Sequence, residues 1–182
     1  MRELALHILD IAENSVSAKA GTITIAVEED HAADRLKISV EDNGKGMTPE
    51  MVEKVTDPFV TSRTTRKVGL GIPLLKAAAE ACEGGLAIRS AVGQGTCLTV
   101  EFQLSHIDRM PLGNMTDTML TLVVGSPEVH WIFTYTVDGQ VFEFDTQPIQ
   151  EALEDVPLSE PAVLTYLREC LETGISALNG TA

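Results

Sequence analysis

The chain has 182 residues, 44% of them hydrophobic, and a formal net charge of −14. This length suffices for one folded core or for a domain with an appendage, and no apolar run approaches the roughly 20 residues that span a bilayer. Nucleic acid is excluded as a partner, because its sustained binding neutralises about 6–10 phosphates and the densest basic stretch, residues 63–67, carries three positive charges.

The first part of the chain begins with one helical and two strand patterns. Residues 1–19 place apolar side chains at helical spacing, and Gly21 follows them. Residues 22–29 and 35–41 alternate apolar and polar side chains. We expect these two segments to form neighbouring antiparallel strands.

A short helix, a polar loop and a second helix come next. Thr48-Pro49 is a suitable cap and first turn for a helix that runs through Val55. Residues 57–71 form a polar, basic loop that ends in glycine. The pattern then predicts a helix followed by two strands, over residues 72–83, 86–92 and 96–104.

A shift in charge and a linker-like run at residues 106–117 indicate a boundary near Ser105. Residues 1–104 hold 11 basic and 15 acidic side chains, whereas residues 105–182 hold 2 and 12. Beyond the boundary we predict three strands and two helices, with Asp138-Gly139 as the hairpin turn between the last two strands and Ser159 as the cap of the last helix: strands 118–124, 131–137 and 140–146, and helices 148–155 and 160–173. We therefore divide the chain into residues 1–104 and an acidic C-terminal region, 105–182.

Three glycine clusters, at residues 42–47, 69–71 and 93–96, carry the strongest chemical signal. None completes a P-loop or a Rossmann motif, and each cluster alone is more often a structural turn than a binding site. Gly69–Gly71 follows the basic loop and opens a helix, where backbone N–H groups and the helix dipole can face phosphate oxygens. Asp42, at a strand end, can accept a hydrogen bond from an exocyclic amine, and Gly44 and Gly46 leave room for a ring beside it.

The first helix carries His7, Asp10 and Asn14 on one face. A carboxylate and an amide oxygen on one face suit a Mg²⁺ ion that keeps several waters and binds substrate phosphates. The alternative is an exposed polar helix face. For His7 itself we expect a packing or hydrogen-bonding role rather than a ligand role.

In their order and spacing, these motifs resemble the ATP-binding domain shared by gyrase, heat-shock chaperones, histidine kinases and MutL, the GHKL superfamily with the Bergerat fold. The similar segments correspond to the N box, the G1 box, the F box with the start of the lid, the G2 box and the closing glycine-Thr strand: residues 10–18, 42–47, 57–63, 68–76 and 93–102. The resemblance covers residues 1–104. It implies an α+β fold, a two-layer α/β sandwich in which helices pack on one face of a mixed sheet, and the C-terminal region would add a small α+β appendage.

The resemblance also implies roles for single residues. Asn14 would coordinate Mg²⁺, and Asp42 would bind the amino group of the adenine. Arg63, where related lids carry Lys, would pair with the terminal phosphate and support phosphoryl transfer. The remaining residues implied to contact ATP shape the adenine pocket or face the phosphates: Gly44, Gly46, Met47, Lys67, Gly69, Leu70, Gly71 and Thr96.

Asp10 stands where ATPases of this superfamily commonly carry Glu as the base for the attacking water. Its side chain is shorter by one CH₂, and a misplacement on the order of 1 Å can cost roughly 10²-fold in rate. We therefore predict slow intrinsic hydrolysis. The short lid, from Pro58 to Val68, is closer to the kinase-like branch than to gyrase or the chaperones.

These features predict an Mg·ATP-binding regulatory protein, similar to stand-alone histidine kinase or anti-sigma kinase ATP domains, that transfers phosphate to a partner protein or grips it. The N box begins within ten residues of Met1, so a kinase would need its phosphoacceptor on another chain. The alternative is a nucleotide-gated interaction module, or a slow ATPase, without phosphoryl transfer to protein. An inactive relic of the fold is a third reading.

Two further expectations concern location and assembly. The three cysteines, Cys82, Cys97 and Cys170, have no metal-ligand spacing, and residues 1–15 are too polar for a signal peptide, so we expect a cytoplasmic protein with reduced thiols. The aromatic side chains of residues 131–144 form either a core or a surface for a homodimer or a partner. The acidic charge of the C-terminal region would steer a basic partner.

Overall fold

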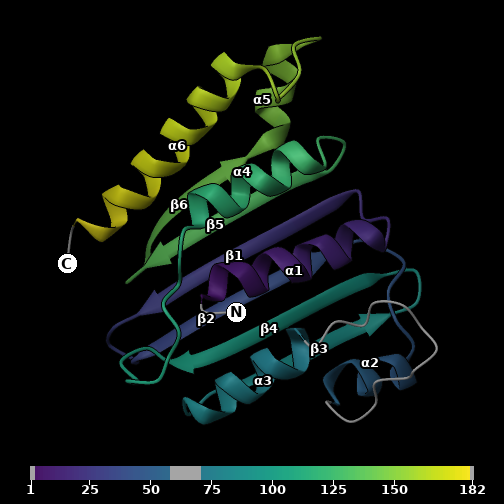
Figure 1. Ribbon diagram of the computed structural model, residues 1–182, viewed down its shortest axis with the longest axis vertical. Coiled ribbons are helices and arrows are strands. Elements are labelled where there is room, and N and C mark those ends of the chain that lie inside the picture. Colours follow the sequence, from purple (N-terminus) through teal and green to yellow (C-terminus); the bar gives the residue numbers. More distant parts are fainter. Residues whose placement is uncertain (1–2, 58–70, 181–182) are drawn as a thin grey trace.

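The computed structural model describes residues 3–57 and 71–180, which form a six-stranded mixed sheet and six helices (Figure 1). The strand order is β3-β4-β2-β1-β5-β6, and every neighbouring pair is antiparallel except β1 and β5, which are parallel. Figure 1 shows α1, α3 and α4 lying across the front of the sheet. The predicted α+β class and mixed sheet are confirmed.

The predicted elements of the first region are all present among the described residues. Their bounds are α1 Leu4–Ser17, β1 Thr22–Asp30, β2 Arg35–Asp42, α2 Pro49–Thr56, α3 Gly71–Ala81, β3 Gly85–Ala91 and β4 Gly95–Gln103. Thr48 caps α2 by accepting a hydrogen bond from the Met51 N–H, as its sequence predicts. The lid residues 58–70 lie outside the described part of the chain.

The C-terminal region contributes α4 Met115–Gly125, β5 His130–Val137, β6 Gln140–Asp145, α5 Thr146–Leu153 and α6 Pro161–Asn179. The Asp138-Gly139 hairpin is confirmed, and both turn residues have positive φ, 48° and 84°, as a type I′ turn requires. The helix predicted over residues 160–173, with Ser159 as its cap, begins at Pro161 and extends to Asn179, and the N-cap position is taken by Glu160 without a side-chain hydrogen bond.

The strand predicted over residues 118–124 is wrong, because this segment forms α4. Asn114 caps the helix by accepting a hydrogen bond from the Asp117 N–H. The segment is apolar on most sides, with Met119, Leu122 and Val123 all buried. A short apolar run of this kind cannot be assigned to strand or helix from its periodicity alone, and the Asn cap four residues before it is the signal that decides for a helix.

The two predicted regions share one sheet and one hydrophobic core. Ile25 of β1 pairs with Val40 of β2 on one side and with Phe133 of β5 on the other, and all three side chains are buried. Trp131 and Phe133 are both 0% exposed, so these aromatic residues pack inside the chain rather than on a partner surface. The division at residue 105 remains a prediction.

The segment that joins the two regions also completes the start of α1. The first N–H groups of a helix have no partner within the helix. Here the Leu4 and Ala5 N–H groups donate to the carbonyls of Pro111 and Leu112, at 3.0 and 2.8 Å. α1 is thereby fixed by residues about a hundred positions later in the chain.

Among residues 3–57 and 71–180, no helix is both long enough and apolar enough to cross a membrane.

Candidate functional site

A pair of buried polar side chains joins the end of β2 to the last turn of α1. The Ser15 hydroxyl donates to Asp42 Oδ2 at 2.6 Å, and the Gly44 N–H donates to Asp42 Oδ1 at 2.9 Å. Both side chains are buried, with Asp42 7% exposed. Since each carboxylate oxygen can accept two hydrogen bonds, Asp42 keeps acceptor capacity for a further donor.

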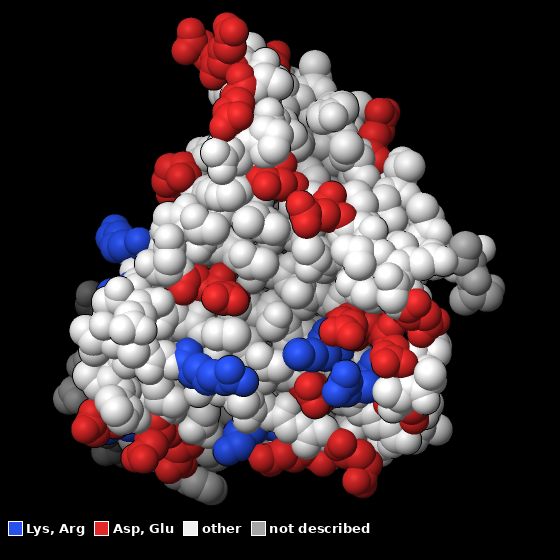
Figure 2. All heavy atoms as spheres, turned by 180° about the vertical axis from the view of Figure 1, so that it is seen from behind, with Lys and Arg blue, Asp and Glu red and all other residues white. Residues whose placement is uncertain are grey.

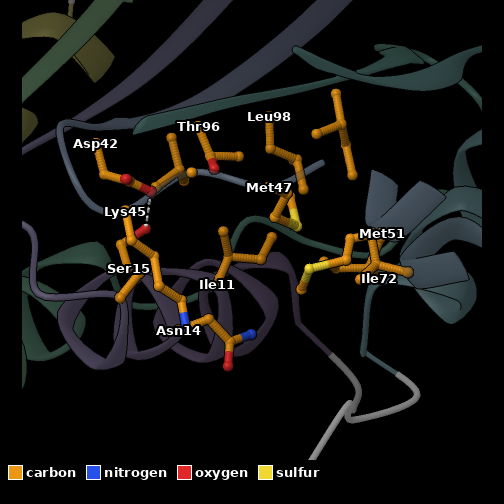
Figure 3. A pocket seen from close by; sticks show the side chains of 15 residues that line it. Ile11, Asn14, Ser15, Asp42, Lys45, Met47, Met51, Ile72, Thr96 and Leu98 are labelled. Atoms are coloured by element: carbon orange, nitrogen blue, oxygen red, sulfur yellow. Dashed lines mark hydrogen bonds between the residues drawn. The ribbon is translucent and has the colours of Figure 1, made fainter. Parts of the chain in front are cut away.

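The Asp42 side chain lines a cavity of about 230 Å³ between the sheet and helices α1, α2 and α3 (Figure 3). The cavity walls are mostly apolar and come from both layers of the fold: Ile11, Val40, Met47, Met51, Val55, Ile72, Ile88 and Leu98. Pockets that hold whole small-molecule ligands usually measure about 300–1,000 Å³. This cavity therefore fits a flat ring system rather than an entire nucleotide.

Thr96 supplies a second polar group, and its hydrogen-bonding role is fixed by its neighbours. Ser90 Oγ donates to the Gly95 carbonyl at 2.9 Å and accepts from the Met47 N–H at 2.8 Å. Since its one proton is used, the 2.9 Å contact between Ser90 Oγ and Thr96 Oγ1 requires the Thr96 hydroxyl to be the donor. Thr96 can therefore only accept from a ligand, as Asp42 does, so the cavity suits a ring that presents hydrogen-bond donors.

The structure brings together five residues that the sequence nominated from three separate segments. Asn14, Asp42, Gly46, Met47 and Thr96 all line this cavity. The Asn14 side chain is exposed, at the edge of the site.

Asp10, Gly44 and Gly71 are not in the cavity lining among the described residues. Asp10 lies one helical turn before Asn14 in α1, and Gly71 is the first residue of α3. Arg63, Lys67, Gly69 and Leu70 lie outside the described residues.

The glycines of the 42–47 loop allow a close approach of two backbones. Gly46 has φ +68°, and a Cβ there would lie 1.9 Å from the Ala91 carbonyl oxygen. Gly95 has φ +89°, and its Cβ would lie 1.9 Å from the Asp42 carbonyl oxygen. The loop is therefore held against the β3–β4 hairpin by contacts that no side chain permits. The predicted role of Gly44 and Gly46, to leave room for a ring, stays a prediction.

His7 is the buried polar group of α1 that lacks a full set of partners. It is 4% exposed, and its Nδ1 has no hydrogen-bond partner within the described chain. Burial lowers the pKa of His7, and the neighbouring Asp10 charge and the Gly71 backbone oppose that shift. His7 therefore favours the neutral form, in contact with the start of α3.

Three polar residues in or beside the cavity were not nominated from the sequence: Ser15, Ser90 and Lys45. Ser15 falls on the apolar stripe of α1, and a hydroxyl on a buried stripe was the signal, because buried polar groups need a partner. Ser90 had no such signal, since its partners come from two other segments. The Lys45 side chain is exposed, yet it lines the same cavity as Asn14 (Figure 3).

Residues 2–106 match the family described as histidine kinase-, DNA gyrase B-, and HSP90-like ATPase. Among curated relatives, the sensor protein kinase FleS of Pseudomonas aeruginosa is 40% identical over 93 residues, covering 51% of this chain and 23% of that protein. A putative sensor histidine kinase NtrY-like of Rickettsia conorii is 28% identical over 109 residues, covering 59% of this chain and 18% of that protein. The chain thus spans about a fifth of the length of these relatives.

Solved structures show the same fold at low sequence identity. The Aquifex aeolicus MutL ATPase domain complexed with ADP matches with a TM-score of 0.54 and 19% identity, over 85% of this chain and 68% of that one. The N-terminal domain of a DNA repair protein matches with a TM-score of 0.56 and 16% identity, over 81% of this chain and 53% of that one. Both matches cover more than the first 104 residues of this chain. At this sequence identity they show a shared fold and nothing further.

Proposed function

The chain belongs to the histidine kinase-, DNA gyrase B- and HSP90-like ATPase family, and we propose that it is an Mg·ATP-binding regulatory protein that acts on a partner protein. The observation that carries the proposal is the cavity in which Asp42 and Thr96 face an apolar slot as hydrogen-bond acceptors. The relatives named as sensor kinases support a signalling role.

The chemistry of the cavity fits the adenine ring. Adenine is flat and apolar on both faces and carries one exocyclic amine, a donor that Asp42 can accept. The base of a guanine nucleotide has a carbonyl at the corresponding position, which would leave two acceptors facing each other. An unpaired buried polar group costs about 1–3 kcal/mol, so the site favours adenine over guanine.

The phosphates would extend from the cavity toward the start of α3. Gly71 begins that helix, where the helix dipole and free N–H groups favour anions. Lys45 lines the cavity beside Asn14 and would contribute a positive charge. Mg²⁺ would be held by the Asn14 amide oxygen together with the phosphates and water, as this ion prefers.

Asp10 would be the base for any hydrolysis, one turn before Asn14 on α1. Its carboxylate is outside the lining of the cavity and is shorter than the Glu common in ATPases of this family. We therefore expect nucleotide binding to be strong and turnover to be slow.

The binding step is tested by titrating Mg·ATP into the wild type and Asp42→Asn by calorimetry. The Asn amide presents a donor to both Ser15 and the adenine amine, so affinity should fall by about a hundredfold, roughly 2.7 kcal/mol. Asp34→Asn is the matched control, because Asp34 also accepts several hydrogen bonds but binds Gln103 and Ser105 away from the cavity. An unchanged affinity in Asp42→Asn would refute the site.

Phosphoryl transfer and nucleotide-gated gripping remain alternative uses of this site. Transfer predicts that label from [γ-³²P]ATP appears on a partner protein and that the label is lost in Asp42→Asn. Gating predicts that the partner binds only with Mg·ATP and stays unlabelled. The two outcomes are separated by one experiment, in which the partner is captured with Mg·ATP and then tested for label.

A further inference from the structure

A groove between α5 and α6 lies at the opposite end of the sheet from the candidate ATP site. It measures about 490 Å³, and its walls include Ile149 and Leu153 of α5 and Val163 and Tyr166 of α6. α5 continues directly from β6, the edge strand farthest from β3 in the strand order. Figure 1 places α5 and the start of α6 at one end of the molecule, whereas α2 and β3 lie at the other.

α6 is apolar on more than the face that it needs for the core. Val163, Leu167 and Leu171 form its buried stripe, at 7%, 0% and 0% exposed. A second stripe, Ala162, Tyr166 and Cys170, is turned by about one residue, and its Tyr166 side chain is 55% exposed. A large exposed aromatic side chain at the mouth of an apolar groove is typical of a contact surface.

The segment that forms the groove carries mostly negative charge. Residues 140–172 carry eight acidic side chains and one basic side chain, Arg168. The Arg168 guanidinium is already paired with Asp117 at 2.7 Å and with Glu172 at 3.6 Å. Figure 2 shows acidic and uncharged residues, and no Lys or Arg, over the end of the rear face where α5 lies.

We propose that this groove binds a basic amphipathic helix of a partner protein, with its apolar face in the groove and its Lys or Arg side chains against the acidic rim. α5 has 8 residues, about 12 Å of helix, which matches two turns of a bound helix in a helix-in-groove contact. The charge disfavours the other occupants, because a second copy of this chain would bring the same acidic rim, and nucleic acid and anionic membranes are negative. The proposal rests on the proposed function only in that the chain has a protein partner.

The test uses defined peptides in place of the unidentified partner. The probe is a fluorescein-labelled peptide of about 15 residues, built from Leu and Lys at helical spacing, and its binding is followed by fluorescence anisotropy. One control peptide carries Glu in place of Lys, and a second has the same Leu and Lys residues shuffled to destroy the helical period. Only the first peptide should bind, and added salt should weaken it.

Substitutions in the protein then locate the contact. Ala162→Glu and Tyr166→Ala alter exposed side chains of the groove. Each should lower the affinity for the Leu and Lys peptide by about tenfold or more. Val141→Glu is the matched control, because Val141 is an equally exposed apolar residue, at 61%, outside the groove lining. Circular dichroism melts establish that each variant is folded, and Asp42→Asn, which should weaken ATP binding, should bind the peptide like the wild type.

Each outcome decides the proposal. Loss of binding in Ala162→Glu and Tyr166→Ala, with full binding in Val141→Glu, supports it. Equal binding of the acidic or shuffled peptide would overturn it, as would a wild-type affinity in both groove variants. A dimer in sedimentation that Ala162→Glu dissociates would assign the groove to a second copy instead. The peptide titrations contain no nucleotide, so a negative result would not bear on the proposed ATP site.

Discussion

The two ends of the sheet each carry a cavity, and the two cavities are built for different ligands. In the half of the sheet that ends at β3, polar groups lie inside the cavity and are held by neighbours: Asp42 by Ser15 and Gly44, and Thr96 by Ser90. At the β6 end, the groove is apolar inside and the segment that forms it is acidic. Fixed polar groups inside a small cavity select one small molecule, whereas an apolar groove with a charged rim suits a protein surface.

The largest effect should come from adding a side chain at Gly46, where the loop beside the candidate ATP site lies close to the backbone of the β3–β4 hairpin. Gly46→Ala places a Cβ 1.9 Å from the Ala91 carbonyl oxygen at a φ of +68°, so we expect a loss of at least about 3 kcal/mol in the free energy of unfolding and loss of ATP binding. Gly93→Ala is the control, since Gly93 has a similar φ of +77° but nothing within 4 Å of its Cβ position. It should lose only about 1–2 kcal/mol. Urea titrations measure both, and equal losses would show that the contact with Ala91 is unimportant.

A smaller loss should follow from removing the hydroxyl that holds Asp42. Ser15→Ala leaves a buried carboxylate oxygen without its 2.6 Å donor, and we expect a loss of about 1–3 kcal/mol in stability and weaker ATP binding. Ser17→Ala, on the exposed side of the same helix, should change neither quantity. If the two variants behave alike in urea titration and calorimetry, Ser15 does not position Asp42.

The pH dependence of stability should reflect His7, which is buried in α1, the helix that also lines the candidate ATP site. Burial lowers its pKa below the ordinary 6.5, so between 6.5 and the folded pKa the unfolded chain binds more protons than the folded chain. Stability should therefore be unaffected by His7 above pH 6.5 and should fall as the pH drops below it. The difference in unfolding free energy between wild type and His7→Gln, measured from pH 7.5 down to 5.5, isolates this contribution. A difference that stays constant with pH would contradict it.

The smallest effect on stability should come from replacing Arg168 of α6. Arg168→Ala removes an exposed ion pair with Asp117, at 48% and 54% exposed side chains, and exposed pairs contribute little to stability. The free energy of unfolding should stay within experimental error of the wild type. Binding of the Leu and Lys peptide should become about two- to threefold tighter, because residues 140–172, which include the groove lining, lose their one positive charge. A clear loss of stability in Arg168→Ala, with no change in peptide binding, would show that Arg168 stabilises the fold and does not oppose the peptide.

The sequence predicted local structure well where a residue period agreed with a cap, as in α2, or with a turn signal, as in the β5–β6 hairpin. The strand predicted in place of α4 is wrong, because the apolar run there has no clear period and the cap at Asn114 was not considered. The parallel pairing of β1 with β5 could not be predicted, because the two strands are separated by about a hundred residues and no local signal links them. The shared sheet was missed for that reason.

The site followed the same rule. Asn14, Asp42, Gly46, Met47 and Thr96 were predicted because each falls in a motif with its own residue pattern, and the fold does bring them to one cavity. The hydrogen bonds from Ser15 to Asp42 and from Met47 to Ser90 depend on which elements meet, and a single sequence carries little information on such contacts. The roles of these residues stay predictions until nucleotide binding is measured.

The central claim is that Asp42 recognises the exocyclic amine of adenine. Calorimetric titration of Mg·ATP and Mg·ITP into the wild-type protein tests it most directly, since inosine has the same size and shape but carries a carbonyl in place of that amine, with a protonated N1 beside it. We expect ATP to bind at least about a hundredfold more tightly than ITP, because ITP leaves the buried Asp42 carboxylate facing an oxygen. Equal affinity for the two nucleotides would contradict the claim.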